Sequence, residues 1–173
     1  MIHLSRTVLD QMKKWIIESK RVKREYSALL LNGMGRHEVG SEYSGPGILG
    51  NKPIFHTHVH FQPEASTLDM ILMAGENRPY SCVGSISRHS RKPTINCYKV
   101  STAKPWYLPI LKRIAAEMPS RFDPTEFTNK LQRRNIKVPL DITTYQFYDR
   151  KWNVSHAVEW FNLGYVAPGG GRL

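Results

Sequence analysis

The sequence contains only two cysteines, Cys82 and Cys97, in 173 residues. No Cys-x-x-Cys pair occurs, so a zinc site built from thiolates is not expected. Cysteines in a reducing compartment persist as free thiols. We therefore expect both residues to be buried thiols rather than partners in a disulfide, and neither is a candidate nucleophile.

Long apolar runs are also missing, although hydrophobic residues make up 40% of the chain, enough to build a core. No run of about 18 apolar residues occurs, so no transmembrane helix is expected. The opening stretch, MIHLSRTVLDQMKKWIIESK, is too polar for a secretory signal peptide. These absences predict a cytoplasmic location with no membrane partner.

Acidic residues are outnumbered, with 14 Asp and Glu against 25 Lys and Arg, which gives a formal net charge of +11. The basic residues cluster at 20–25, 87–92 and 131–137. A positive field attracts acidic partners such as nucleic acid or an acidic protein. The clusters are dispersed, however, and carry no recognised nucleic-acid-binding motif. We therefore interpret them as an evenly basic surface, and nucleic acid is not the expected partner.

Hydrophobic periodicity and turn signals predict a mixed fold. Helices are expected at 5–19 with Ser5 as N-cap, at 66–74, at 106–120, from Asp123 onward, and at 154–165 up to Gly164. Strands are expected at 26–33, 54–61, 80–88, 94–101 and 142–152, with 80–88 and 94–101 forming a hairpin. Between 34 and 53 the Gly- and Pro-rich sequence predicts loop with a short strand or two. This order predicts an α/β or α+β protein with a sheet flanked by helices.

Histidine is scarce, with seven in the chain, yet three of them lie in FHTHVHF at 55–61. On a strand, His56, His58 and His60 would point to the same face. Imidazoles at i and i+2 can bind one metal ion, and Asp69 can supply a third ligand if a helix returns beside the strand. Two histidines and one carboxylate leave a fourth position for water, which is typical of catalytic rather than structural zinc sites.

Each part of this pattern also has a structural interpretation. Three histidines on one strand face can be a polar surface, and Ser66 with Asp69 matches the helix capping box. The whole pattern, His-x-His, seven residues, Ser, two residues, Asp, would arise by chance roughly once in a thousand such chains. A serine that caps the helix is also compatible with an aspartate that binds a metal.

The segment HTHVHFQPEASTLD resembles the JAMM motif, His-x-His-x7-Ser-x2-Asp, of the JAMM/MPN+ (JAB) metalloprotease family. The resemblance covers about residues 2–116, and its specific part is this motif. It implies Zn²⁺ bound by His56, His58 and Asp69. It also implies that the hydroxyl of Ser66 stabilises the oxyanion formed when the substrate carbonyl is attacked.

The family also has a glutamate on an early strand that serves as general base and acid. REYSALLLNG is similar to that segment, so the resemblance assigns the role to Glu25. Glu38 and Glu42 also lie upstream of the histidines, but in Gly-rich sequence without a following apolar strand.

Three features depart from the family pattern. Val59 stands where the family usually has proline after the second histidine, and His60 is an additional imidazole that we interpret as a partly exposed strand residue or a group near the substrate. The stretch from Glu25 to His56 is also short for the family, which suggests an open site.

The resemblance implies an MPN (JAB)-like domain over residues 1–120, followed by a C-terminal extension, 121–173, of unknown role. The implied function is a zinc-dependent isopeptidase or peptidase that cleaves after the C-terminal glycine of ubiquitin or a ubiquitin-like protein. The implied partners are such a protein or its conjugates and the E1- and E2-like enzymes of the same pathway, as in the prokaryotic stand-alone branch of the family.

Other functions stay open at this point. The chain could be a non-catalytic MPN-like scaffold, or a basic module that binds nucleic acid or protein. Scaffold members typically lose a ligand histidine or the aspartate, whereas this sequence keeps all four motif positions. The motif is also compatible with a small-molecule hydrolase or with a peptidase that frees sulfur-carrier proteins.

Overall fold

The computed structural model describes residues 1–42, 48, 50–60, 63–65, 69, 73, 78–100 and 137–162. The elements described along their full length are one helix and seven strands, and all seven strands belong to one sheet. The elements are α1 (Arg6–Val22), β1 (Tyr26–Leu30), β2 (Met34–Val39), β3 (Ile54–Thr57), β4 (Ser81–Ile86), β5 (Pro93–Val100), β6 (Lys137–Tyr148) and β7 (Lys151–Asn162).

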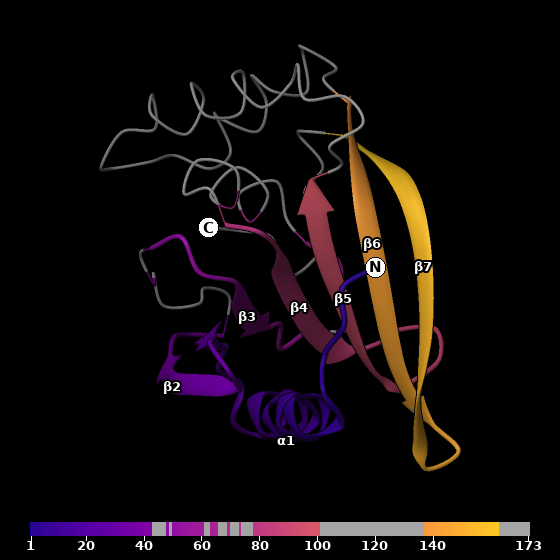
Figure 1. The fold of residues 1–173 in the computed structure, drawn as a ribbon. Coiled ribbons are helices and arrows are strands. Elements are labelled where there is room, and N and C mark those ends of the chain that lie inside the picture. The colour runs from indigo at the N-terminus through magenta and orange to yellow at the C-terminus, as the bar shows by residue number, and fades with distance from the viewer. Residues whose placement is uncertain are drawn as a thin grey trace.

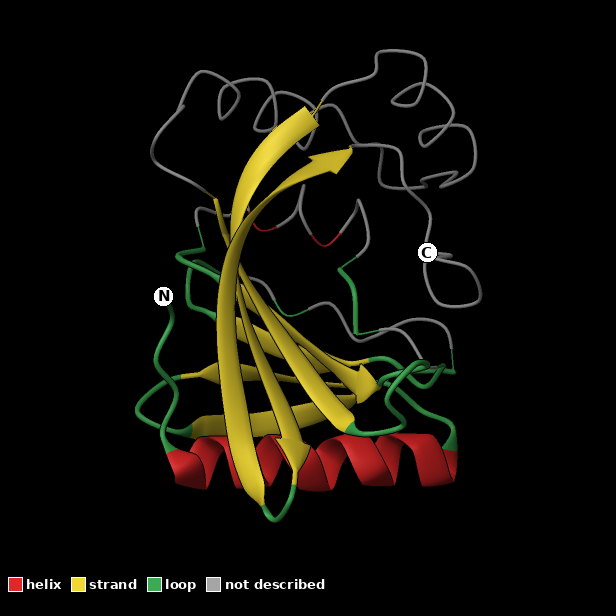
Figure 2. Cartoon of the chain, turned by 90° about the vertical axis from the view of Figure 1, so that its right-hand side faces the viewer, coloured by secondary structure: helices red, strands yellow, loops and turns green. Residues whose placement is uncertain are grey.

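The strands lie side by side in the order β2-β1-β3-β4-β5-β6-β7. The pair β3–β4 is parallel, and every other neighbouring pair is antiparallel. Helix α1 covers one face of the sheet (Figures 1 and 2). The chain is therefore a mixed α/β protein, as the order of its elements predicted.

Helix α1 confirms the first predicted helix and extends it from residue 19 to Val22. Ser5 is the N-cap, and its side chain accepts a hydrogen bond from the backbone N–H of Val8 at 3.2 Å. The helix ends because Lys23 adopts a left-handed conformation with φ of 56°, and its N–H returns to the carbonyl of Ser19.

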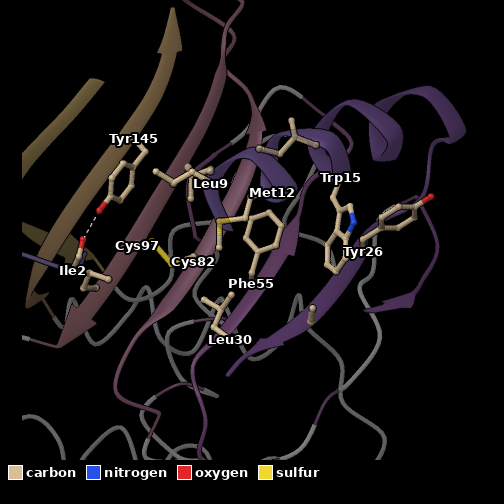
Figure 3. Packing of buried hydrophobic residues seen from close by; sticks show 13 residues of the cluster. Ile2, Leu9, Met12, Trp15, Tyr26, Leu30, Phe55, Cys82, Cys97 and Tyr145 are labelled. Atoms are coloured by element: carbon tan, nitrogen blue, oxygen red, sulfur yellow. Dashed lines mark hydrogen bonds between the residues drawn. A yellow bond between two sulfur atoms is a disulfide. The ribbon is translucent and has the colours of Figure 1, made fainter. Parts of the chain in front are cut away.

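The core lies between α1 and the middle of the sheet (Figure 3). The ring of Trp15 packs against Phe55 of β3, with 6.3 Å between the ring centroids. Helix and sheet are in close contact at Gly84 of β4, where an added Cβ would lie 2.7 Å from Cδ1 of Ile16 and 2.8 Å from Cε2 of Phe55. A glycine at this position lets the helix sit directly on the strands.

The two cysteines form a disulfide, so the expectation of two thiols was wrong. Cys82 on β4 and Cys97 on β5 are register partners, and their Cα atoms lie 4.0 Å apart. Both side chains point toward α1 and are fully buried (Figure 3). The sequence argument relied on compartment alone, whereas the hairpin pairing places the two sulfur atoms against each other.

The N-terminal residues are hydrogen-bonded to side chains of β6. The N–H of Ile2 donates to Oγ1 of Thr143 at 2.9 Å, and the Tyr145 hydroxyl donates to the Ile2 carbonyl at 2.6 Å (Figure 3). The same hydroxyl accepts from the N–H of Leu4 at 3.1 Å. Strands β6 and β7, which follow the predicted boundary at residue 120, belong to the same sheet as β1–β5, and β6 contacts the N-terminal segment.

One predicted helix is a strand. Residues 154–165 were expected to be helical, but β7 spans Lys151–Asn162 and pairs with β6 along its whole length. The chain reverses at Asp149 and Arg150, whose φ angles of 52° and 61° are those of a tight hairpin turn. Val154, Val158 and Trp160 also fit an alternating pattern, and pairing with β6 decides in favour of the strand.

The strands predicted at 26–33, 80–88 and 94–101 are confirmed, and β3 is shorter than expected because it ends at Thr57. The strand predicted at 142–152 is confirmed only as far as Tyr148, because the chain turns at 149–150 and residues 151 and 152 begin β7. The helices predicted at 106–120 and from Asp123 lie outside the described residues. Of the helix predicted at 66–74, only Asp69 and Met73 are described, and both are helical. Within the described part of the chain, no helix combines the length and the apolarity needed to cross a membrane.

Candidate metal centre

Strand β3 places two histidines on the face of the sheet that α1 does not cover. Phe55, between β1 and β4, points to the helix, so His56 points to the other face. The ladder continues one residue past the strand, since the N–H of His58 donates to the Gly84 carbonyl at 2.9 Å. His58 therefore shares the face of His56, and the two ring centroids lie 5.1 Å apart.

The third histidine does not extend this row, which corrects the expectation of three histidines on one strand face. Ser85 of β4 holds the bend after β3, because its hydroxyl lies 3.0 Å from the His58 carbonyl and 2.8 Å from the His60 carbonyl. Nε2 of His60 lies instead 3.4 Å from Oε1 of Glu42. His60 thus belongs to a separate contact beside the pair.

The chain next crosses the same face of the sheet over β5. The side-chain amide of Asn96 donates to the Pro63 carbonyl at 2.9 Å, and the N–H of Ala65 donates to the Tyr98 hydroxyl at 3.1 Å. The Tyr98 side chain is almost fully buried, and burial raises the pKa of its hydroxyl well above the ordinary value. A neutral hydroxyl is thus available to hold this segment of the chain.

This path brings Asp69 to the histidine pair. Oδ2 of Asp69 lies 3.3 Å from Nε2 of His56 and 3.8 Å from Nε2 of His58. One candidate ligand atom from each of the three residues lies within 4.8 Å of the other two. Ligands held about 2.0–2.1 Å from a tetrahedral ion are separated by roughly 3.3 Å, so the three donors are close to such an arrangement.

The donors also fit a metal ion by their chemistry. Nε2 of His56 is buried, and no described group meets it with hydrogen-bond geometry. A buried imidazole nitrogen in that state loses its solvation without compensation unless a cation or a proton is present. Two imidazoles and one carboxylate are a ligand set that suits Zn²⁺. The set also resembles the two-histidine, one-carboxylate triad of iron(II) sites, so ligand type alone does not select the metal.

Electrostatics favour positive charge at this point. Burial lowers the pKa of His56 and is the largest single influence on it, but the carboxylates of Asp69 and Glu25 outweigh burial. The pKa of His56 is therefore raised above its ordinary value. The same negative charges that retain a proton on the imidazole would attract a divalent cation when the proton leaves.

Glu25 lies beside the cluster and is 4% exposed. In the pairing of β1 with β3, Ser27 is opposite His56, so the same register carried two residues back places Glu25 opposite His58. Its backbone is held from the other side, because its N–H donates to the Ser41 carbonyl at 2.9 Å and its carbonyl accepts from the Gly40 N–H at 2.8 Å. A buried carboxylate is thus placed on the histidine face.

The two alternative glutamates lie elsewhere. Glu38 is exposed on β2, and Glu42 contacts His60. Of these three candidate glutamates, Glu25 is the one whose charge acts on His56. Ser66, the predicted oxyanion donor, lies outside the described residues.

Sequence reasoning missed the residues that support the cluster. Ser85, Asn96 and Tyr98 hold the segment between His58 and Ala65, and they come from β4 and β5. Arg78 is buried and donates to the carbonyls of Ile48 and Lys52 ahead of β3. None of these residues is close in sequence to its partner, so only the strand pairing reveals their roles.

Comparisons of the chain with protein-family models, with curated proteins and with solved structures give no match. The functional argument therefore rests on the residues themselves.

Proposed function

We propose that the chain is a zinc-dependent isopeptidase or peptidase of the JAMM/MPN+ type. The observation that carries the proposal is the convergence of His56, His58 and Asp69, with ligand atoms within 4.8 Å of one another, beside the buried Glu25. These are four of the five residues that the motif assigns to the site. An MPN-like fold is part of the proposal, and the helix–strand order and the mixed sheet support it.

The proposed ligands are His56, His58 and Asp69, which offer two neutral imidazoles and one carboxylate. When Zn²⁺ is bound there, it supplies Lewis acidity and lowers the pKa of water toward neutrality. The same three side chains fix the position of the ion on the face of the sheet that α1 does not cover, because the ladder to β1 and β4 holds both histidines.

Glu25 is the proposed general base and acid. Its carboxylate takes a proton from the attacking water and later donates it to the nitrogen of the leaving amine. The backbone bonds to Gly40 and Ser41 keep the side chain in place for both transfers. The hydroxyl of Ser66 is proposed to donate to the oxyanion, a contribution worth about 10²–10³ in rate.

The proposed substrate is a carbonyl at the C-terminal glycine of ubiquitin or a ubiquitin-like protein, joined to a lysine amine or to a following residue. A thin, extended glycine tail can reach a donor set that lies on a sheet face. The proposed setting is the cytoplasm, together with E1- and E2-like enzymes of the same pathway. Both cysteines of the disulfide are fully buried, which limits their access to cytosolic reductants.

The experiment that tests the proposal measures metal content and cleavage together. Purified protein should hold about one zinc ion per chain and release a ubiquitin-like protein from a fusion, and a chelator should abolish the cleavage. The variant His58→Ala should lose both metal and activity, whereas His89→Ala, at an exposed turn position, should keep both. Metal-free wild-type protein that still cleaves the fusion would refute the proposal.

A matched pair of variants tests the base. Glu25→Gln should keep the metal and lose most of the turnover, because an amide cannot accept the proton. Glu38→Gln removes an exposed carboxylate from β2 and should change neither. Full turnover by Glu25→Gln would assign the proton transfer to another residue.

A further inference from the structure

Strand β7 ends the sheet at the side opposite β2 (Figure 1). Every residue from Val154 to Trp160 is exposed, so both faces of the strand meet solvent over this stretch. Three of these residues are large and apolar, with exposed fractions of 51% for Val154, 57% for Val158 and 56% for Trp160. Apolar side chains on a strand at the margin of a sheet are typical of a pairing surface.

Two protections that the residues of an edge strand can themselves provide, a bulge and a proline, are missing from β7. It pairs with β6 without a register shift over twelve residue pairs, so no bulge bends it out of line. Its sequence, KWNVSHAVEWFN, has no proline, and its one lysine is at the start. A long, regular strand at the margin of a sheet is suited to pairing with a further strand.

The charges of β7 are self-complementary. Lys151 and Glu159 stand at equal distances before and after Ser155, on the same face of the strand. In an antiparallel pair of two β7 strands with Ser155 opposite its own copy, Lys151 of each chain faces Glu159 of the other. We propose that two copies of this chain associate through β7 in this register and form one continuous sheet.

Neighbouring registers lack this match. If Val154 were opposite its own copy, Glu159 would face Asp149, a like charge. If His156 were opposite its own copy, Lys151 would face Phe161 and Glu159 would face Asn153. Opposite residues of a symmetric antiparallel pair share a face, so the centre of the pair can move only from one residue to the next. Of the three centres compared, Ser155 is the one that places Lys151 opposite Glu159.

The other face of β7 supports the same register with an apolar pair, Val158 and Trp152. Around Ser155, Val158 lies opposite Trp152 of the second copy, and Val154 lies opposite His156. Each contact occurs twice because of the two-fold symmetry. Trp152 is already fixed, since its indole N–H donates to Asp10 of α1 at 3.0 Å. A preorganised aromatic side chain lowers the cost of ordering the interface.

Charge exchange tests the register in the full chain, with the oligomeric state measured by sedimentation equilibrium. Wild type should sediment at twice the mass of one chain. Lys151→Glu and Glu159→Lys should each weaken dimerisation roughly tenfold or more, because two attractive pairs become repulsive. The double variant should recover the wild-type affinity. Lys14→Glu, an equal charge change at an exposed position of α1, is the control and should leave dimerisation unchanged.

Cross-linking tests the axis without disturbing the charges. Ser155→Cys places a thiol opposite its own copy, within about 5 Å between Cβ atoms, and mild oxidation should join the two chains. Ala157→Cys lies on the same face but faces Asn153 of the second copy, so it should cross-link far less. The native cysteines are buried in their disulfide and do not compete.

Three results would overturn the proposal. They are a monomeric wild type that Ser155→Cys does not cross-link, a dimer that neither charge reversal weakens, and equal cross-linking at positions 155 and 157. The last two would indicate a different surface, or a segment of another protein as the occupant of the β7 edge.

Discussion

Oδ2 of Asp69 lies 3.3 Å from Nε2 of His56, although the two residues belong to different elements and the chain crosses β5 between them. The approach places a carboxylate against a buried imidazole. If this contact serves a metal ion, Asp69→Asn should reduce zinc affinity by more than the roughly 10–100-fold loss that follows removal of a ligand's outer partner. Zinc titration against a competing chelator measures this loss, and an unchanged affinity would remove Asp69 from the ligand set.

The pKa of His56 predicts how the metal-free protein responds to pH. Burial lowers this pKa, but Asp69 and Glu25 together raise it by more than burial lowers it, so the folded value exceeds the ordinary 6.5. The resulting stability is present below the unfolded value and is lost as pH rises through the folded pKa. Chelated protein should therefore melt at a lower temperature above this window than below it, and His56→Gln should flatten that dependence.

Zinc should show the opposite trend over the same window. The ion needs a neutral imidazole, so its affinity should rise as the proton leaves His56. Zinc binding followed across the pH range checks this, with Asp69→Asn as a comparison in which the pKa of His56 is lower. A zinc affinity that does not change with pH would contradict a ligand role for His56.

The support of the cluster can be tested at Tyr98. Tyr98→Phe removes the hydroxyl that accepts from the N–H of Ala65 and leaves that buried amide without this partner. We expect a loss of about 1–3 kcal/mol in unfolding free energy and a weaker zinc affinity. Tyr148→Phe, at the exposed end of β6, is the control and should change neither. Normal zinc affinity in Tyr98→Phe would show that the 63–65 segment does not position Asp69.

The contact between α1 and the sheet depends on the absence of a side chain at position 84. Gly84→Ala would bring its Cβ within 2.7 Å of Ile16 and 2.8 Å of Phe55, so we expect a loss of about 1–3 kcal/mol in urea unfolding. Gly35→Ala on β2 is the control, because its Cβ would meet only the Leu29 backbone oxygen at 3.4 Å and the Leu29 Cβ at 4.0 Å. Shortening Ile16 to valine should recover part of the loss, and equal stability of the two alanine variants would contradict this packing.

Local signals were sufficient for the elements whose patterning is strong. Ser5 and the spacing of Leu9, Met12 and Ile16 predicted α1, and the short connection between two strand-like runs predicted the β4–β5 hairpin. Alternation along a strand placed His56 and His58 on one face, the motif spacing added Asp69, and the family resemblance added Glu25.

What the sequence could not supply are the consequences of pairing between distant strands. Whether 154–165 is a helix or a strand is decided by β6, which pairs with it through a turn at Asp149 and Arg150. The disulfide depends on the register of Cys82 and Cys97, and the role of His60 depends on the bend held by Ser85. Each of these features depends on residues that are far apart in the sequence, whereas hydrophobic periodicity reports only on a short continuous segment.

Anomalous X-ray diffraction at the zinc absorption edge, from crystals of the zinc-loaded protein, tests the central claim most directly. The account predicts one strong peak about 2.0–2.2 Å from Nε2 of His56, Nε2 of His58 and a carboxylate oxygen of Asp69, with the Glu25 carboxylate next to it. No peak at these three side chains, or a peak bound by other residues, would contradict it.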